Sequence, residues 1–337
     1  MTTSDLYRPP RPTISYELYP PRTPKGETQV WDTVTQLADH VADYFSVTYG
    51  ASGSTASTSQ ALVERIINET SVPVIAHLTC VGRTAEQLRE VVGAFLDAGV
   101  RNFLALRGDP PEGVVDWKPA PGEVGRACDL VTLIREVEAE RFGSRGLDPI
   151  SRLADHRSRR TAVSIAVAAY PGLERAGAAP DGGHPAGGVT DGAVAGASRF
   201  RVREDELVAL RAKQDAGADF AITQLFFDAA AYRELLGASR AAGIRLPLVP
   251  GILPLTDPAR IRRLCDLNGI AHPAEILGTL DATTDPEERR RIGLEATTSL
   301  VRDVLAAGAP GLHLYTFNKA DGVTALLEDV LAERMPA

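Results

Sequence analysis

Ile14-Ser15-Tyr16-Glu17-Leu18-Tyr19-Pro20-Pro21-Arg22 is the stretch around which the chain is best interpreted. Apolar and β-branched residues from Thr13 to Tyr19 predict a β-strand, and the two prolines end it because proline has no N–H for a ladder. Glu17 is therefore expected near the carboxyl end of a strand. A carboxylate is costly to bury there unless something uses it. For a single strand, a glutamate at this position is more often an exposed or ion-paired surface residue than a functional one. Whether Glu17 belongs to a functional site therefore depends on what the ends of the other strands carry.

A glycine-containing junction between helix and strand recurs four times. Each copy follows a helical pattern and precedes an apolar run, as expected where glycine takes the left-handed position after a helix. Before the first copy, Thr84 and Gln87 predict a capping box at the start of an amphipathic helix. The copies are Asp97-Ala-Gly-Val100, Asp215-Ala-Gly-Ala218, Ala241-Ala-Gly-Ile244 and Ala306-Ala-Gly-Ala309.

Eight apolar runs are predicted to be strands, with helical patterns between them. Most are continuous rather than alternating, which is typical of parallel strands covered on both faces. Eight such units predict an α/β fold, a (β/α)8 TIM barrel that forms a single domain over residues 1–337. A doubly wound open sheet is the alternative, but no GxGxxG follows the first strand. The runs are Thr13 to Tyr19, Tyr44 to Tyr49, Val74 to Thr79, Asn102 to Gly108, Ala162 to Tyr170, Phe220 to Phe226, Pro247 to Leu253 and Gly311 to Phe317.

Two insertions interrupt this repeat. Arg141 to Arg160 is charged and precedes the fifth strand, whereas Gly172 to Arg199 is rich in Gly and Ala and follows it. The second is expected on the active-site side of a barrel, either as a lid or as a disordered segment. Ala320 to Arg334 predicts a closing helix, so no fused regulatory domain is expected.

Composition excludes several classes of protein. The 337 residues contain no apolar run long enough to span a bilayer, and the first twelve lack the apolar segment of a secretion signal, so a cytoplasmic location is expected. The three widely spaced cysteines favour free thiols over disulfides or a zinc site. A net charge of -8 without a basic stripe disfavours nucleic acid as a partner.

Polar residues end nearly every predicted strand, and in barrels the active site forms at those ends. Individually they have ordinary explanations: His77 as a core histidine, Arg107 and Asp109 as an ion pair, the tyrosines as rim packing. Gln224 is harder to dismiss, because an amide suits the edge of a heterocycle. The polar ends are Glu17, Thr48 and Tyr49, His77 and Thr79, Arg107 to Asp109, Tyr170, Thr223 and Gln224, Gly251 to Pro254, and Tyr315 with Asn318 and Lys319.

The chain contains no P-loop, HExxH or GxSxG motif and no metal-spaced Cys/His set. One acid, an Arg/Asp pair, amides and tyrosines suit proton-assisted chemistry on a flat polar ligand. The residues alone do not name that ligand.

Eight segments, in order from Ile14 to about Ala320, resemble the methylenetetrahydrofolate reductase family. The resemblance implies a (β/α)8 barrel that moves a hydride from a reduced nicotinamide, usually through bound FAD, to 5,10-methylenetetrahydrofolate, giving 5-methyltetrahydrofolate. The segments are ISYELYPPR, SVTYGA, AHLTC, ALRGD, AAYP, AITQLFFD, PGILP and LHLYTFNKA.

The resemblance gives two residues catalytic roles. Glu17 is implied to be the general acid that protonates N10 of the folate and opens its five-membered ring to a 5-iminium cation. Such an acid needs a raised pKa, which partial desolvation could supply. Asp109 matches an aspartate beside the pterin, where an anion stabilises the cation.

Four further residues are implied to bind the folate. Gln224 matches a folate-binding glutamine, and Lys319 stands where relatives carry an arginine, so it keeps the charge but loses the bidentate fork. Tyr315 and Arg260 complete the set, although Arg260 and Leu264 replace the usual Gln and Phe.

The flavin positions match only in part. In the helix after the fifth strand, Ala209 and Ala212 stand where relatives have Asn and Arg, and the insertion replaces the segment that usually follows Tyr170-Pro171. Charge-assisted contacts contribute about 1.5 to 3 kcal/mol each, so their loss should weaken binding of a diphosphate. The matching positions are Thr48, Tyr49, Ala51, His77, Arg107, Gly108, Asp109, Ala127, Tyr170 and Lys213.

The resemblance therefore favours a flavin-free member in which NADH reduces the folate directly, with FAD and metals absent. Three alternatives stay open: a flavoenzyme that binds phosphate through His184 or Arg199, a folate-binding barrel without catalysis, and a reductase that uses a deazaflavin. The sequence determines neither the choice of NADH over NADPH nor the oligomeric state.

Overall fold

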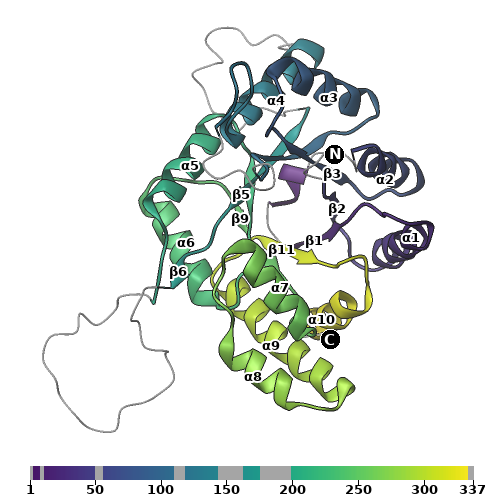
Figure 1. Cartoon of the computed structure of the whole chain (residues 1–337), viewed down its shortest axis with the longest axis vertical. Coiled ribbons are helices and arrows are strands. Elements are labelled where there is room, and N and C mark those ends of the chain that lie inside the picture. Colours follow the sequence, from purple (N-terminus) through teal and green to yellow (C-terminus); the bar gives the residue numbers. More distant parts are fainter. Residues whose placement is uncertain are drawn as a thin grey trace, which may run out of the picture.

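Nine parallel strands form the central sheet of the computed structural model, with helices around it (Figure 1). The structure describes residues 3–7, 11–49, 56–109, 118–142, 162–174 and 199–332. The strands are β1 (Thr13–Leu18), β2 (Tyr44–Val47), β3 (Val74–Thr79), β4 (Asn102–Leu106), β5 (Ser164–Ala169), β8 (Phe220–Thr223), β9 (Leu248–Val249), β10 (Gly251–Ile252) and β11 (Gly311–Tyr315).

The strand order is β10-β11-β1-β2-β3-β4-β5-β8-β9. The two outermost strands, β9 and β10, are halves of one predicted strand that Pro250 interrupts, since proline cannot donate to a ladder. The carbonyl of Pro250 still accepts a hydrogen bond of 2.9 Å from the N–H of His313 in β11. The sheet thus nearly closes on itself, and the predicted (β/α)8 barrel is confirmed.

Several strands are shorter than predicted. β2 ends at Val47, β4 at Leu106 and β8 at Thr223. The polar residues Thr48, Arg107 and Gln224 therefore lie immediately after the strands, in the loops that surround one mouth of the barrel.

The helix boundaries follow local sequence signals. The capping box of Thr84 and Gln87 is present at the start of α3. The four junction glycines have positive φ angles, as predicted. The seventh unit contains three helices, α7, α8 and α9, rather than one. The helices are α1 (Pro24–Asp39), α2 (Ala56–Glu69), α3 (Ala85–Asp97), α4 (Ala127–Phe142), α5 (Glu204–Asp215), α6 (Ala229–Ala241), α7 (Pro258–Asn268), α8 (Ala274–Ala282), α9 (Pro286–Ala306) and α10 (Asp321–Ala332).

The amino end of the barrel is filled with apolar side chains. Tyr44, Phe220 and Val249 belong to a fully buried cluster inside it. A short 3-10 helix, η1 (Thr3–Tyr7), lies against this cluster: the ring of Tyr7 is 4.6 Å from that of Phe220, and the N–H of Thr3 donates to Asn102 Oδ1 at 2.9 Å. The amino end is therefore closed by packing and by these buried hydrogen bonds.

A small antiparallel pair, β6 (Leu173–Glu174) with β7 (Phe200–Arg201), flanks the second insertion. Residues 175–198, which include His184, lie outside the described residues, as do residues 143–161 of the first insertion. Cys80, Cys128 and Cys265 are free thiols. No helix in the described segments is both long and apolar enough to cross a membrane.

Candidate active site

Glu17 points into the barrel from β1. Alternate side chains of a strand face opposite sides, and Tyr16 packs outward, its ring 6.1 Å from that of Phe45. Ser15 and Glu17 therefore face inward. Glu17 is 8% exposed and pairs across the sheet with Ser46 on β2 and Tyr315 on β11. The carboxylate is thus buried within the mouth.

His313, on β11, contacts the carboxylate of Glu17. Its Nε2 lies 3.4 Å from Glu17 Oε2, and its Nδ1 lies 2.9 Å from the hydroxyl oxygen of Ser15. The Ser15 hydroxyl also donates to the carbonyl of Leu312 at 3.0 Å. His313 is fully buried, so these contacts replace water on both ring nitrogens.

His77, on β3, approaches Glu17 from the other side. Its Nε2 is 4.0 Å from Glu17 Oε2 and is also hydrogen bonded to the hydroxyl of Ser46. Burial lowers the pKa of His77 to about 4, and the neighbouring Glu17 offsets only part of this effect. His77 is therefore neutral near pH 7.

The expectation of a raised pKa for Glu17 is wrong for the ligand-free protein. Burial does raise it, but the hydrogen bond from His313, together with the effects of His77 and Tyr19, outweighs burial and lowers the pKa. Because His77 is neutral near pH 7, His313 is the partner that matters. Glu17 is ionised in this state and must gain a proton before it can act as an acid.

The loop after β11 is fastened to the end of β1. Phe317 and Asn318 both have left-handed φ angles, 50° and 55°. The Asn318 side chain accepts from the N–H of Tyr19 and donates to its carbonyl, both at 2.8 Å. The rings of Tyr19 and Phe317 stack at 5.2 Å, and the guanidinium of Arg260 lies 4.7 Å from the Phe317 ring. These contacts form one wall of the mouth.

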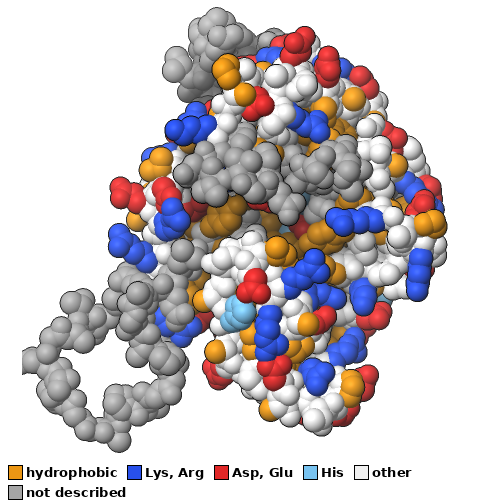
Figure 2. Space-filling view, in the orientation of Figure 1, with side chains coloured by type: hydrophobic (Ala, Val, Ile, Leu, Met, Phe, Trp, Pro, Cys, Tyr) orange, Lys and Arg blue, Asp and Glu red, His pale blue; other side chains and the backbone are white. Residues whose placement is uncertain are grey.

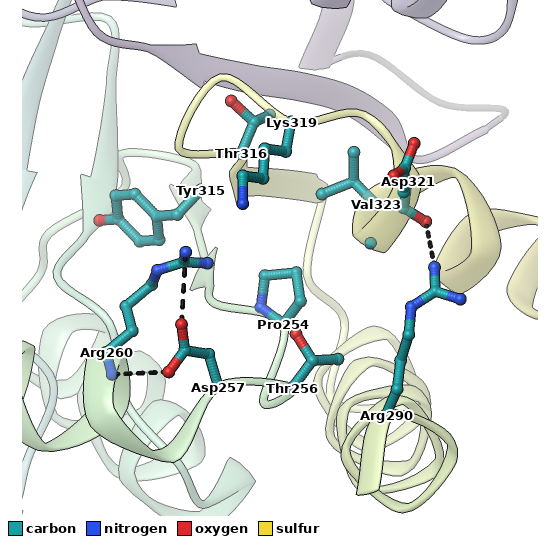
Figure 3. A pocket seen from close by; sticks show the side chains of 11 residues that line it. Pro254, Thr256, Asp257, Arg260, Arg290, Tyr315, Thr316, Lys319, Asp321 and Val323 are labelled. Carbon is teal, nitrogen blue, oxygen red and sulfur yellow. Dashed lines mark hydrogen bonds and ion pairs between the residues drawn. The ribbon is translucent and has the colours of Figure 1, made fainter. Parts of the chain in front are cut away.

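A pocket of about 200 Å³ opens beside this wall (Figure 3). Tyr315, Lys319 and Arg260, three of the predicted substrate-binding residues, line it together. Arg290 from α9 lines it as well and was not predicted. Figure 2 shows Lys and Arg side chains gathered over this part of the surface, around α7 to α10.

Gln224, the fourth predicted folate ligand, is not among the residues that line this pocket. Its side-chain amide donates to Asn268 Oδ1 at 2.7 Å, and its Oε1 accepts from the N–H of Leu225 at 2.9 Å. A ligand that uses this amide would have to replace the contact with Asn268.

The predicted cofactor residues Thr48, His77, Gly108 and Tyr170 follow or end strands β2 to β5, on the other side of the mouth from the pocket. Gly108 has φ +88°, and a Cβ there would lie 2.8 Å from Val81, so the turn requires glycine.

Arg107 and Asp109, on either side of Gly108, are exposed, and no ion pair joins them in the described structure. The hydroxyl of Tyr49 accepts from Arg83 at 3.0 Å. Ala127 is buried at the start of α4. Ala51 lies outside the described residues.

Helix α5 has alanines at the two positions where the resemblance implies polar flavin ligands. The buried ammonium of Lys213 donates to the carbonyl of Ala168 at 2.8 Å, and burial lowers its pKa although Glu206 opposes the shift. The other cation of α5, Arg211, donates to the carbonyl of Gly243. Ala209 and Ala212 have no polar side chain and so offer no phosphate ligand, and the ammonium of Lys213 is buried against a backbone carbonyl.

Sequence reasoning missed Ser15, Ser46 and His313. A signal for His313 was present: it precedes Tyr315 by two residues on the same strand, so both face the interior. The serines gave no signal of their own, because small hydroxyl residues are common in strands.

Comparison with known proteins identifies the family. The family model for methylenetetrahydrofolate reductase matches residues 4–330. The chain belongs to this family. It is 31% identical over 318 residues to methylenetetrahydrofolate reductase (NADH) 1 of Zea mays, covering 94% of this chain and 48% of that protein.

A bacterial relative matches over most of its length. The chain is 29% identical over 309 residues to 5,10-methylenetetrahydrofolate reductase of Escherichia coli, covering 91% of this chain and 87% of that protein. It therefore spans about half of the plant methylenetetrahydrofolate reductases but most of the bacterial one.

A solved structure has the same fold. It is an uncharacterized protein from Clostridium thermocellum described as binding two copies of 5-methyl-5,6,7,8-tetrahydrofolic acid, with a TM-score of 0.60, 14% identity and 99% of each chain covered. At this identity the likeness concerns the barrel alone.

Proposed function

We propose that this member of the methylenetetrahydrofolate reductase family reduces 5,10-methylenetetrahydrofolate to 5-methyltetrahydrofolate, with a hydride taken directly from NADH. The observation that carries the proposal is the buried Glu17 at the barrel mouth, 3.4 Å from His313. A protein that only binds folate has no need of a buried acid with a histidine partner.

Glu17 acts as the general acid in this proposal. Each turnover consumes one proton and one hydride: the proton goes to N10 as the bond from N10 to the methylene carbon breaks, and the hydride goes to that carbon. Since Glu17 is ionised in the ligand-free protein, its carboxylate must take up a proton before it can act. A ligand that closes the mouth excludes water from the carboxylate, which favours its neutral form and moves the proton onto Glu17.

Asp109 and Gln224 hold the pterin in this proposal. Asp109 is exposed at the end of β4, free of an ion pair with Arg107, so its negative charge is available to the iminium cation. The Gln224 amide, now paired with Asn268, can instead pair with the polar edge of the pterin.

NADH supplies the hydride, and the named relatives from plants carry NADH in their names. Direct transfer is supported by α5, where Ala209 and Ala212 lack polar side chains and the ammonium of Lys213 already donates to the carbonyl of Ala168. The residues after β2 to β5, chiefly Thr48, Tyr49 and Arg107, would then contact the dinucleotide.

The test is the visible absorption spectrum of the purified protein, followed by NADH oxidation with 5,10-methylenetetrahydrofolate, with and without added FAD. We expect no flavin band and turnover that FAD does not increase. A stoichiometric flavin band with FAD-dependent turnover would refute direct transfer while leaving the overall reaction in place. Absence of folate reduction with NADH, NADPH or a reduced deazaflavin would refute the reaction itself.

A paired substitution strengthens this test. Ala209→Asn with Ala212→Arg restores the two side chains that flavin-binding relatives carry, so the double variant should gain affinity for FAD. Ala241→Arg, at an exposed position of helix α6, adds a cation elsewhere and serves as the control. FAD titration followed by fluorescence quenching measures all three proteins. Equal affinity in the three would mean that these alanines do not govern flavin binding.

A further inference from the structure

The pocket in Figure 3 begins at the barrel mouth and leads away from Glu17. Tyr315, the cross-strand neighbour of Glu17, borders it at one end, and Arg290 on α9 borders it at the other. Sites for complete small molecules have volumes of roughly 300 to 1,000 Å³, and this one has about 200 Å³. It is therefore suited to one part of a larger ligand whose remainder lies in the mouth.

The charges of the pocket favour an anion. Arg260, Lys319 and Arg290 line it against only two carboxylates, Asp257 and Asp321. Asp257 is 3.4 Å from Arg260 and caps the start of α7, so these two contacts already compensate its negative charge. With this pair set aside, Lys319 and Arg290 face one carboxylate, Asp321, so the lining keeps a net positive charge.

Two of these cations retain free donors. The ammonium of Lys319 points into the pocket (Figure 3) and has no hydrogen-bond or ion-pair partner within the described part of the chain. One nitrogen of Arg290 donates to the carbonyl of Asp321 at 3.1 Å. A guanidinium has five N–H donors, so Arg290 can bind a carboxylate without losing that contact.

We propose that this pocket is a subsite for the carboxylates of a folate tail that carries more than one γ-linked glutamate. Lys319 takes the carboxylate of the first glutamate and Arg290 that of a later one. This proposal rests on the proposed function, because it assumes that the ring system of a folate occupies the mouth.

The phosphates of NADH are the other anions that could reach a basic pocket. The pocket is built from β11, α7, α9, α10 and the segment after β10, whereas the predicted dinucleotide residues follow β2 to β5. In the strand order, β1 separates β11, which lines the pocket, from β2, where the predicted dinucleotide residues begin. The position of the pocket therefore favours the folate tail.

The experiment compares 5,10-methylenetetrahydrofolate carrying one and three glutamates as substrates of the full chain. For Arg290→Gln we expect the KM of the triglutamate to rise about fivefold, the size of effect that one partly exposed charge pair gives. The KM of the monoglutamate, the KM of NADH and kcat should change less than twofold. Added salt should reduce the advantage of the triglutamate in the unchanged protein.

Arg291→Gln is the matched control. Arg291 lies on the same helix but pairs with Glu288 and Glu295 instead of lining the pocket. It should leave the preference for the triglutamate unchanged. An equal rise in KM for both folates in Arg290→Gln, or a rise for NADH, would overturn the proposal.

Binding can also be measured without turnover, by fluorescence titration with pteroyl-mono-γ-glutamate and pteroyl-tri-γ-glutamate. Arg290→Gln should weaken only the second. This result separates the two proposals: tail-dependent binding in a protein that fails to reduce folate would retain the subsite and refute the activity. Equal binding of both compounds by the unchanged protein would refute the subsite.

Discussion

Two serine–histidine pairs flank Glu17, and they are not equivalent. On the β1–β11 side, His313 uses one nitrogen for Ser15 and the other for Glu17, which lies 3.4 Å away. On the β2–β3 side, His77 directs a single nitrogen toward both Ser46 and Glu17, and the distance to the carboxylate is 4.0 Å. His313 can thus bind Glu17 while its other nitrogen stays satisfied, whereas His77 cannot.

The two histidines are therefore expected to have different roles, although the sequence alone does not distinguish them. Burial keeps His77 neutral near pH 7, so it packs beside the carboxylate of Glu17 without adding a charge. The hydrogen bond from His313 lowers the pKa of Glu17. The following substitutions test this division, from the largest expected effect to the smallest.

Glu17→Gln removes the group on which both histidines converge. Glutamine keeps the size of the side chain but cannot deliver a proton, and general acid catalysis contributes about 10²- to 10⁴-fold. We expect kcat to fall about 10³-fold while folate binding, measured by fluorescence titration, stays within a few fold. Unchanged turnover would remove Glu17 from the mechanism.

The buried neutral His77 should make stability depend on pH. Its pKa in the folded protein is about 4, below the value of about 6.5 in an unfolded chain. The unfolded state therefore binds more protons between these values, and stability falls as pH drops through this window, by about 3 kcal/mol in total. Urea unfolding from pH 7 to 4 measures this loss.

His77→Gln should make the stability curve flatter over the same pH range, because the titrating group is gone. Glu17 also contributes in this direction: its pKa is lowered, so the stability that it supplies is present above its unfolded pKa and is lost at the acid end. A His77→Gln curve as steep as that of the unchanged protein would show that another group is responsible.

His313→Gln breaks the closer pair. The hydrogen bond that lowers the pKa of Glu17 is lost while burial remains, so the pKa of the carboxyl should rise, and ¹³C NMR of labelled glutamate can follow it. We expect kcat to fall about 10- to 100-fold, because the catalytic carboxyl loses the hydrogen bond that holds it in place. If His77→Gln changed the pKa of Glu17 as much as His313→Gln does, the two serine–histidine pairs would be equivalent.

Ser15→Ala should have the smallest effect. It leaves His313 in place but removes the partner of Nδ1, a buried hydrogen bond with a net contribution of about 1 kcal/mol. kcat should fall about threefold to tenfold. Ser46→Ala is the matched comparison, and its effect on kcat should be smaller, because Ser46 contacts His77, the histidine that lies farther from Glu17.

The sequence predicted the barrel because its signals are local and repeated. The continuous apolar runs, the junction glycines and the capping box of Thr84 and Gln87 each depend on a few neighbouring residues. The polar strand ends gave the position of Glu17 and the composition of the mouth. The break at Pro250 and the three helices of the seventh unit did not follow from the repeat.

The pKa of Glu17 could not be predicted from the sequence, because its sign depends on two opposing effects. Burial, which the sequence indicated, raises it, whereas contact with His313 lowers it. That contact joins residues 296 positions apart, and only the register of β1 with β11 brings them together. The same limit applies to Arg290, whose place in the pocket depends on how α9 packs.

The two hydrogen bonds between Asn318 and Tyr19 have a consequence for synthesis of the protein on the ribosome. Glu17 and Tyr19 are made almost 300 positions before His313 and Asn318. Until β11 has emerged and paired with β1, the carboxylate has neither its histidine partner nor the wall beside it. The nascent chain therefore carries an unfinished site until β11 and the loop after it have been made.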